Sequence, residues 1–423
     1  MKVVIIAGGK GTRIASVNSE IPKSMIPVEG KPIIEYEVEL AKRYGFKEFI
    51  FITGHLGEHI SNYFGDGSRW GVYIDYFHEH QPLGTAGALG SLREKLTEDF
   101  FVFYGDTIVD IDMLAMLDYH QRKHSDATLF THPNDHPYDS DLVDLDSDGS
   151  IKRFLLKPHP DNLVCKNMVN ASLFILSPKV LQLITPGVKS HIEKDILPRC
   201  LEKGLRLFGY VSFEYIKDMG TPDRYDAVCR DMREGIVARR NNRTPRPAIF
   251  LDRDGVITKE VHLLHRPEQL QLVEGAAEAL RRINSSDYLA IIVTNQPVIA
   301  RNLCSINDLE HIHATLETML GQQHAYVNAI YYCPHHPDSG YPEERKEYKV
   351  KCKCRKPAPG MLLQAAKDWN IDLSASYMIG DSDRDVQAGE NAGCKQSLRI
   401  ETNAPNALLK VLETLGVFSK NQD

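Results

Sequence analysis

The second half of the chain carries two carboxylates whose spacing suits chemistry at phosphorus. Asp252 and Asp254 follow the apolar run 248–251, which we expect to be a short buried strand. Carboxylates at positions i and i+2 beyond a strand end can converge on one cation, with one free to attack phosphorus and the other to handle a proton. An Asp-x-Asp pair alone is a weak signal, so it needs support from the elements around it.

Further polar groups follow later apolar runs, which we expect to be neighbouring strands of a parallel sheet. These groups are Thr294 and Asn295 after the run 290–293, Arg355 and Lys356 before a proline, and Asp381 and Asp385 after the run 377–379. Because parallel strands end at the same edge of a sheet, we expect these side chains to meet the two aspartates there. The sequence therefore predicts a phosphoryl-transfer site at this edge.

This ordered set resembles the haloacid dehalogenase-type phosphatases and covers essentially all of the second half. The resemblance implies that Asp252 forms an aspartyl-phosphate, while Asp254 protonates the leaving alkoxide and later activates water. It also implies that Thr294 and Lys356 hold the phosphoryl oxygens. The implied Mg²⁺ ligands are Asp252, Asp254, Asp381 and Asp385. Only 41 residues separate Asp254 from Gln296, too few for a large inserted cap, so we expect loops to select the substrate.

Three of the eight cysteines gather around one histidine. Cys333 and His335 form a C-x-H pair, and Cys352 and Cys354 form a C-x-C pair 16 residues later. Three thiolates and one imidazole suit a closed tetrahedral Zn²⁺ site with a structural role. Chance clustering and a redox pair are the alternatives, and the pairing of ligands around so polar a loop favours zinc.

The zinc loop restricts the resemblance to a few kinds of phosphatase. Phosphatases of this type with such a loop include histidinol-phosphate phosphatases and heptose bisphosphate phosphatases, and the runs 333–337 and 352–361 are close to the heptose enzymes. Asn295 belongs to a Thr-Asn-Gln run that also agrees with them. The resemblance implies that Arg355 reaches a substrate phosphate through a bidentate contact.

The first half opens with a glycine-rich turn. The apolar run 3–7 leads into Gly8, Gly9, Gly11 and Arg13. Glycines after a parallel strand let the backbone approach a ligand closely and present N–H groups to phosphate oxygens. The spacing fits neither the P-loop nor the dinucleotide-binding fingerprint. Glycine turns also end strands for purely steric reasons, so the turn needs support from the motifs that follow it.

Residues 8–221 resemble the sugar-1-phosphate nucleotidyltransferases. The motifs that carry the resemblance occur in order, at residues 8–13, 22–23, 30–32, 82–87, 105–106, 157–158, 170–171 and 218–221. In this family a sugar phosphate attacks the α-phosphorus of a nucleoside triphosphate and releases pyrophosphate. Crowding two polyanions requires positive charge and a divalent ion.

That resemblance implies roles across the first half. Arg13 and Lys23 would serve the triphosphate and the α-phosphoryl group. Asp106 and Asp218 would share a Mg²⁺. The residues implied in substrate binding are Gly8, Gly9, Gly11, Gly84, Thr85, Lys157 and Asn170.

Two details of the first half bear on its substrates. The run 82–87 resembles that of guanylyltransferases for mannose-type sugars. Leu156 stands where the family often has a glutamate that binds a sugar hydroxyl, which argues against simple analogy with glucose or mannose.

The elements that must position these groups alternate between short apolar runs and longer stretches of helical period, which predicts an α/β fold throughout. We expect an N-terminal nucleotidyltransferase domain over 1–237, with a mixed or parallel sheet flanked by helices. Residues 238–247 contain four arginines and two prolines and are interpreted as an exposed linker rather than a recruitment patch. A haloacid dehalogenase-like parallel-sheet domain with a zinc loop is expected over 248–423.

Composition excludes several functions. The net charge of −7 over 423 residues argues against broad binding of nucleic acid. No apolar run approaches the ~18 residues of a membrane-spanning helix, and the sparse cysteines indicate a reducing, cytoplasmic location. The oligomeric state stays open.

We interpret the chain as a bifunctional enzyme of GDP-heptose synthesis, a precursor route for lipopolysaccharide. One half would remove the C7 phosphate of D-glycero-D-manno-heptose 1,7-bisphosphate, and the other would transfer a nucleotidyl group, GMP from GTP, to heptose 1-phosphate. The alternatives are a mannose-1-phosphate guanylyltransferase fused to a histidinol-phosphate-type phosphatase, or one half acting as a non-catalytic sensor of sugar nucleotide.

Overall fold

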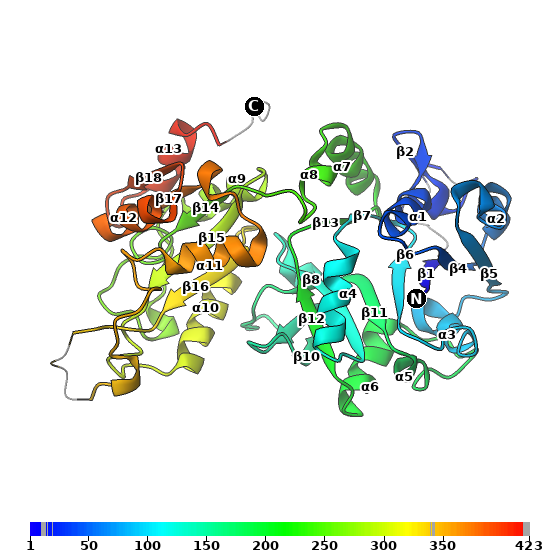
Figure 1. The fold of residues 1–423 in the computed structure, drawn as a ribbon, viewed down its shortest axis with the longest axis horizontal. Helices are drawn as coiled ribbons and strands as arrows, with labels where there is room; N and C mark the ends of the chain where they lie inside the picture. The colour runs from blue at the N-terminus through cyan, green and yellow to red at the C-terminus, as the bar shows by residue number, and fades with distance from the viewer. Residues whose placement is uncertain (10–13, 15, 19, 339, 341–342, 418–423) are drawn as a thin grey trace. The chain divides into compact units, whose positions relative to one another are not determined.

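The computed structural model describes residues 1–9, 14, 16–18, 20–338, 340 and 343–417, which form two compact units (Figure 1). The first unit comprises Met1–His132, Asp141–Leu156 and Asn170–Asn241. The second comprises Pro133–Ser140, Lys157–Val169 and the chain from Asn242 onwards. Each unit is an α/β fold with its own sheet and apolar core, which confirms the expected fold class.

The first unit is built on a mixed nine-stranded sheet. Its strands are β1 (Val3–Ala7), β4 (Glu48–Thr53), β5 (Tyr73–His78), β6 (Phe100–Tyr104), β8 (Ala127–His132), β9 (Leu142–Leu145), β10 (Ile151–Leu155), β11 (Val169–Leu176) and β12 (Leu207–Val211). Seven of them follow the order β10-β9-β11-β6-β1-β4-β5, and β8 pairs with β11 and β12. β1 pairs in parallel with β4 and β6, whereas β11 runs antiparallel to β6. The central strand β1 is apolar along its length, as expected of a strand covered on both faces.

Helices and two small sheets complete the first unit. The helices are α1 (Ile33–Arg43), α2 (Gly57–Phe64), α3 (Gly84–Gly90), α4 (Met113–Arg122), α5 (Pro178–Leu181), α6 (Leu197–Glu202), α7 (Pro222–Arg233) and α8 (Ile236–Arg239), with 3-10 turns at Lys23–Met25 and Ser68–Trp70 and a π-helical turn at Ile192–Ile196. The small sheets pair β2 (Pro27–Val28) with β3 (Lys31–Pro32) and β7 (Thr107–Asp110) with β13 (Tyr215–Asp218).

The second unit is built on a five-stranded parallel sheet. Its strands are β14 (Ala248–Leu251), β15 (Leu289–Asn295), β16 (Ala329–Cys333), β17 (Tyr377–Gly380) and β18 (Gln396–Arg399). They follow the order β16-β15-β14-β17-β18, and every pair is parallel. The helices are α9 (Ala276–Asn284), α10 (Ile306–Gly321), α11 (Gly360–Trp369), α12 (Asp383–Ala392) and α13 (Ala407–Thr414), with 3-10 turns at Pro137–Asp139, Pro267–Gln269, Lys346–Tyr348 and Leu373–Ala375. This order places β14 between β15 and β17, so the groups that follow these three strands share one edge.

Two segments that connect strands of the first sheet belong to the second unit. Residues 133–140 and 157–169 pack on helix α10, where the Tyr138 hydroxyl donates to the carbonyl of Thr318 at 3.3 Å. The Asn167 N–H donates to the Glu317 carboxylate at 2.6 Å, and Lys166 pairs with Glu310 at 2.6 Å. The sequence-based domain boundaries assign both segments to the first domain, because nothing in the sequence of these segments indicates that they pack on α10.

The predicted linker is less exposed than expected. The division between units falls between Asn241 and Asn242, but Asn241 is buried and its amide donates to Asp110 at 2.9 Å. Arg246 is buried too, and its N–H donates to the carbonyl of Asn370 at 3.1 Å. Residues 238, 239 and 243–245 are exposed, as expected of a linker, whereas Asn241 and Arg246 pack on neighbouring elements. Among the described residues, no helix combines the length and apolarity needed to cross a membrane.

Candidate active sites

The carboxylates predicted in the second half converge at the edge of its parallel sheet. Asp252 follows β14, Asp381 follows β17, and Asp385 lies in the first turn of α12. One carboxylate oxygen from each lies within 4.8 Å of the others. The Asp385 carboxylate also accepts from the N–H and hydroxyl of Ser382, at 3.0 and 2.6 Å, which caps α12 and fixes the orientation of Asp385.

Lys356 lies among these carboxylates and is almost fully buried. Its Nζ is 2.9 Å from Asp252 Oδ2 and 2.6 Å from Asp385 Oδ1. The predicted binding residue Asn295 holds the backbone of Lys356, accepting from its N–H at 3.0 Å and donating to its carbonyl at 3.1 Å. In this arrangement Asn295 fixes the position of the lysine.

The electrostatics of the group fit a divalent cation. Burial raises the pKa of Asp252 to about 7, Lys356 opposes this increase, and the negative charges of Asp385 and Asp254 add to it. When Asp252 is ionised, three carboxylates against one ammonium leave two negative charges in a largely buried place. Oxygen ligands of this type are those that Mg²⁺ prefers. The donor set therefore matches metal binding.

Asp254 lies outside this group of three. Its Oδ1 accepts from Arg253 Nε at 2.9 Å and from the Thr258 hydroxyl at 3.0 Å, and its Oδ2 accepts from Arg253 Nη2 at 2.8 Å and Gln296 Nε2 at 2.9 Å. Burial alone would raise the pKa of Asp254, but Arg253 and the other donors outweigh it and lower the pKa. The Gln296 amide also donates to Thr294 Oγ1 at 2.9 Å, so it links two predicted residues.

Gly255 lets the loop after β14 approach Asp381. Its φ is +83°, and a Cβ atom there would lie 2.2 Å from Asp381 Oδ2. Both observations favour glycine at this position.

The four predicted zinc ligands come together. The sulfurs of Cys333, Cys352 and Cys354 lie 3.0–3.5 Å apart, and His335 Nδ1 lies 3.6 Å from Cys333 Sγ and 3.4 Å from Cys354 Sγ. A tetrahedron with metal–sulfur bonds of about 2.3 Å has edges of roughly 3.8 Å, so a small expansion would admit a metal ion. Arg355, predicted to reach substrate, is half-buried and donates to the carbonyl of His335 at 3.1 Å.

In the first unit, Lys23 and the two predicted metal aspartates lie close together. Lys23 pairs with Asp106, and β13 aligns Asp218 with Thr107, the neighbour of Asp106. Arg224 Nη1 donates to Asp218 at 2.6 Å. Burial raises the pKa of Asp218, but the interactions with Arg224 and the N–H of Gly220 outweigh burial and lower it. The predicted residues Gly11 and Arg13 lie outside the described residues.

The glycines of the first half allow close backbone approaches. A Cβ on Gly8 would lie 2.4 Å from Glu79 Oε2, while the open surroundings of Gly9 impose no such limit. Gly84 begins α3 with φ +73°, and a Cβ there would lie 2.4 Å from the carbonyl of Ser190. The hydroxyl of Thr85 accepts from the N–H of Ile192 at 2.9 Å.

Glu193, in the π-helical turn, is a polar centre that the sequence reasoning missed. Its carboxylate accepts from the hydroxyls of Tyr104 at 2.6 Å, Ser172 at 3.3 Å and Thr85 at 3.4 Å. The predicted residue Asn170 lies on the same strand as Ser172 and accepts from its N–H at 3.2 Å. No motif marks Glu193, because its three partners come from distant parts of the chain.

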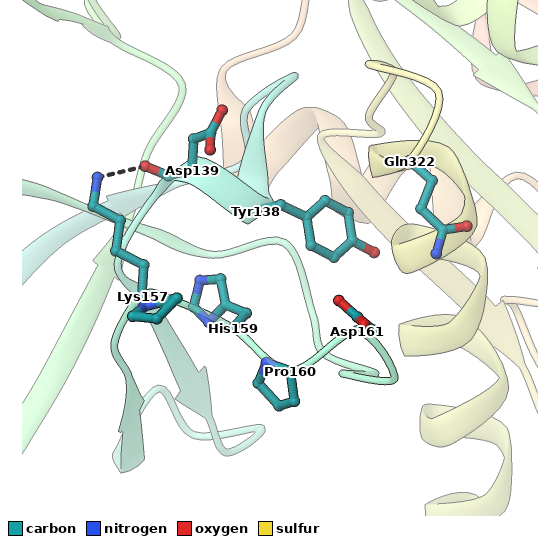
Figure 2. Close-up of a pocket in the computed structure, with 8 residues that line it drawn as sticks. Tyr138, Asp139, Lys157, His159, Pro160, Asp161 and Gln322 are labelled. Carbon is teal, nitrogen blue, oxygen red and sulfur yellow. Dashed lines mark hydrogen bonds between the residues drawn. The ribbon is translucent and has the colours of Figure 1, made fainter.

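Lys157 lies in the second unit, although it was predicted to bind substrate of the first. Its Nζ donates to the carbonyl of Asp139 at 2.7 Å (Figure 2). The surrounding pocket has a volume of about 640 Å³ and is lined by Tyr138, Asp139, Lys157, Pro158, His159, Pro160, Asp161 and Gln322.

Comparison with known proteins matches each half to a family. The nucleotidyl transferase family model matches residues 2–235, and a HAD-hydrolase-like model matches residues 353–400. The D-glycero-beta-D-manno-heptose-1,7-bisphosphate 7-phosphatase of Pasteurella multocida is 40% identical over 158 residues, which are 37% of this chain and 83% of that protein.

Two other similar proteins are sugar-phosphate nucleotidyltransferases. The UTP–glucose-1-phosphate uridylyltransferase of a Synechocystis species is 31% identical over 273 residues, 61% of this chain and 69% of that protein. The mannose-1-phosphate guanylyltransferase of Mycobacterium tuberculosis is 30% identical over 235 residues, 55% of this chain and 65% of that protein.

Fold, sites and matches together define an enzyme that joins a nucleotidyltransferase domain to a HAD-like phosphatase domain. The chain belongs to the nucleotidyl transferase family and, through its second half, to the family of the heptose-bisphosphate 7-phosphatases.

Proposed function

We propose that this enzyme first removes the C7 phosphate of D-glycero-D-manno-heptose 1,7-bisphosphate and then transfers GMP from GTP to the resulting heptose 1-phosphate, releasing pyrophosphate. The observation that carries the proposal is the likeness of the second half to a 7-phosphatase along 83% of that protein's length. The product of such a phosphatase is a sugar 1-phosphate, the class of substrate that a sugar-phosphate nucleotidyltransferase consumes.

In the phosphatase reaction, Asp252 is the proposed nucleophile. Its carboxylate oxygen forms a bond to phosphorus while the bond from phosphorus to the sugar oxygen breaks, and Lys356 neutralises charge on the phosphoryl oxygens. Thr294 would donate its hydroxyl to the same oxygens. Mg²⁺, held by Asp252, Asp381 and Asp385, would supply further neutralisation of the transferred group.

Asp254 is the proposed acid and base of the two half-reactions. It gives a proton to the departing sugar oxygen and then takes one from the water that attacks the aspartyl-phosphate, which releases phosphate and returns Asp252 to its carboxylate form. Its four hydrogen-bond donors favour the carboxylate form, which suits the second half-reaction. For the first half-reaction, the proton on Asp254 would take the place of one hydrogen bond from its neutral donors, Thr258 or Gln296, while Arg253 keeps both of its contacts. Zn²⁺ at Cys333, His335, Cys352 and Cys354 is proposed to hold the loop that precedes Arg355 and Lys356.

In the transferase reaction, Lys23 is proposed to exchange Asp106 for an oxygen of the α-phosphoryl group. The sugar 1-phosphate oxygen then bonds to the α-phosphorus and pyrophosphate leaves. Asp106 and Asp218 would hold the Mg²⁺ that neutralises the triphosphate, and their adjacency across β7 and β13 supports this. The similar proteins include both a uridylyltransferase and a guanylyltransferase, and the likeness of the run 82–87 to that of guanylyltransferases is what supports guanine as the base.

A panel of substrates tests the proposal. The protein is incubated with Mg²⁺, each of the four nucleoside triphosphates, and heptose 1-phosphate or mannose 1-phosphate, and nucleotide sugars are separated by chromatography. We expect GTP with heptose 1-phosphate to be the most efficient pair. No nucleotide sugar from heptose 1-phosphate with any triphosphate would refute the transferase assignment, and faster release of phosphate from histidinol phosphate than from the heptose bisphosphate would refute the phosphatase assignment.

A further inference from the structure

Arg253, the residue between the two aspartates of the phosphatase site, is completely buried. Its side chain is 0% exposed and heads the largest fully buried side chains of the described residues. A buried guanidinium is strongly unfavourable unless its charge and its N–H groups are paired. The partners of Arg253 therefore indicate why the site contains it.

Two edges of the guanidinium have different partners. Nε and Nη2 donate hydrogen bonds to the two oxygens of Asp254 at 2.9 and 2.8 Å, which forms a bidentate pair between adjacent residues. Nη1 lies 3.2 Å from His313 Nε2. Because a guanidinium only donates hydrogen bonds, His313 Nε2 is the acceptor, which places the imidazole proton on Nδ1.

His313 is itself held from several sides. It lies on the buried face of α10 and its ring packs 5.6 Å from the ring of Tyr332. Glu310 and Glu317, one turn before and one turn after it, are anchored by Lys166 and by the N–H of Asn167. The helix, and with it His313, is therefore fixed against movement along its axis.

Together these contacts give the Asp254 carboxylate one orientation. Each of its oxygens has one donor from Arg253 and one from a neutral side chain, Thr258 or Gln296. The carboxylate is thus kept out of the group formed by the other three aspartates, although it is only two residues from Asp252.

We propose that Arg253 and His313 are positioning residues for proton transfer in the phosphatase reaction: Arg253 fixes the Asp254 carboxylate where it exchanges protons with the sugar oxygen and with water, and His313 fixes Arg253. This inference rests on the proposed function, in which Asp254 handles both protons. Misplacing a catalytic group by about 1 Å is enough to slow a reaction by roughly 10²-fold.

Rapid-mixing kinetics of Arg253→Lys in the full chain test the proposal. Lysine keeps the charge but lacks the planar fork that grips both oxygens. With p-nitrophenyl phosphate, whose leaving group needs no proton, we expect a burst of about one p-nitrophenolate per active site, then turnover slowed about 10–100-fold by hydrolysis of the aspartyl-phosphate. Because only the second step slows, KM should fall together with kcat and kcat/KM should stay unchanged. Transferase activity of the same sample reports the concentration of chains with a folded first unit.

A pair of substitutions at His313 supplies a second test. Glutamine offers an acceptor to Arg253 and leucine does not, so we expect His313→Gln to retain most activity and His313→Leu to behave like Arg253→Lys. Equal slowing of both phases without a burst, or equal activity of the two His313 variants, would overturn the proposal. The burst assay needs no heptose, so a wrong sugar assignment would show only as failure of the wild-type enzyme on the heptose bisphosphate.

Discussion

The two candidate sites place a lysine beside aspartates in contrasting surroundings. Lys356 is 1% exposed and lies between two carboxylates of which one, Asp385, is also 1% exposed. Lys23 is 12% exposed and its partner Asp106 is 35% exposed. A transferred phosphoryl group is small and suits a closed, prearranged set of charges, whereas a nucleotide and a sugar need a more open site, which is consistent with the proposed exchange of partners by Lys23.

Replacing each of the two lysines should give the largest difference between the two sites. We expect Lys356→Met to lower phosphatase kcat at least about 10³-fold and the free energy of unfolding of the second unit by about 3–5 kcal/mol, because it leaves the buried Asp385 and the half-buried Asp252 without their cationic partner. Lys23→Met should slow the transferase and change the stability of the first unit by less than about 1 kcal/mol. Activity assays and urea unfolding measure both effects, and similar stability losses in the two variants would contradict the contrast.

The thiolate cluster gives the next largest expected effect. Cys352→Ser should remove the bound metal, proposed to be about one zinc per chain, and lower phosphatase activity roughly 10–100-fold, because the loop that leads to Lys356 loses its anchor. Transferase activity should be unchanged. Metal analysis and the two assays check this, with Cys394→Ser as the control, since Cys394 lies outside the cluster. Full metal content in Cys352→Ser would exclude the cluster as the binding site.

Alanine variants at two glycines with the same φ distinguish the effect of a local clash from the effect of backbone strain. Gly255 and Gly393 both have φ +83°, but only at Gly255 would a Cβ meet a neighbour, 2.2 Å from Asp381 Oδ2, whereas nothing lies within 4 Å at Gly393. Both alanine variants should lose about 1 kcal/mol of stability from strain. We expect only Gly255→Ala to lose about tenfold or more in phosphatase kcat, and equal activities would show that Asp381 is not displaced.

The smallest effect on activity is expected at Glu317, where stability should depend on pH. Burial raises the pKa of Glu317 from 4.5 to about 7, against an opposing contribution from the Asn167 N–H. The folded protein then holds this proton more tightly than the unfolded chain, so the second unit loses stability as pH rises from about 4.5 to 7, by at most about 3 kcal/mol.

Unfolding of Glu317→Gln at several pH values isolates this contribution. A Trp70→Phe background leaves Trp369 as the fluorescent reporter of the second unit. The difference in free energy of unfolding between variant and parent should change across this pH range and be flat above it. Glu390→Gln, an exposed position, is the control, and a pH-independent difference at Glu317 would contradict the expectation.

The sequence predicted the groups that follow strand ends and missed those fixed by distant contacts. Asp252, Thr294 and Asp381 follow apolar runs that form parallel neighbours, so strand order brings them together. The pairing of Cys and His by spacing likewise predicted one cluster. Such signals are local, so they can be recognised from the amino-acid sequence alone.

What the sequence did not reveal depends on tertiary packing. No motif marks Arg253, because its importance depends on its burial and on its contact with His313 on α10. Glu193 gathers hydroxyls from three distant elements, and residues 157–169 dock on a helix about 150 positions further along the chain, as the 150-residue separation of Asn167 and Glu317 shows. No periodicity or motif in the sequence indicates these tertiary contacts.

Phosphorus NMR of a single mixture tests whether dephosphorylation precedes nucleotidyl transfer. Heptose 1,7-bisphosphate, GTP and Mg²⁺ are followed with the wild-type chain, Asp252→Asn and Lys23→Met. We predict that the wild type forms phosphate, pyrophosphate and GDP-heptose, that Asp252→Asn leaves the bisphosphate unchanged, and that Lys23→Met accumulates heptose 1-phosphate. Nucleotide sugar formed by Asp252→Asn at the wild-type rate, or bisphosphate untouched by the wild type, would contradict the account.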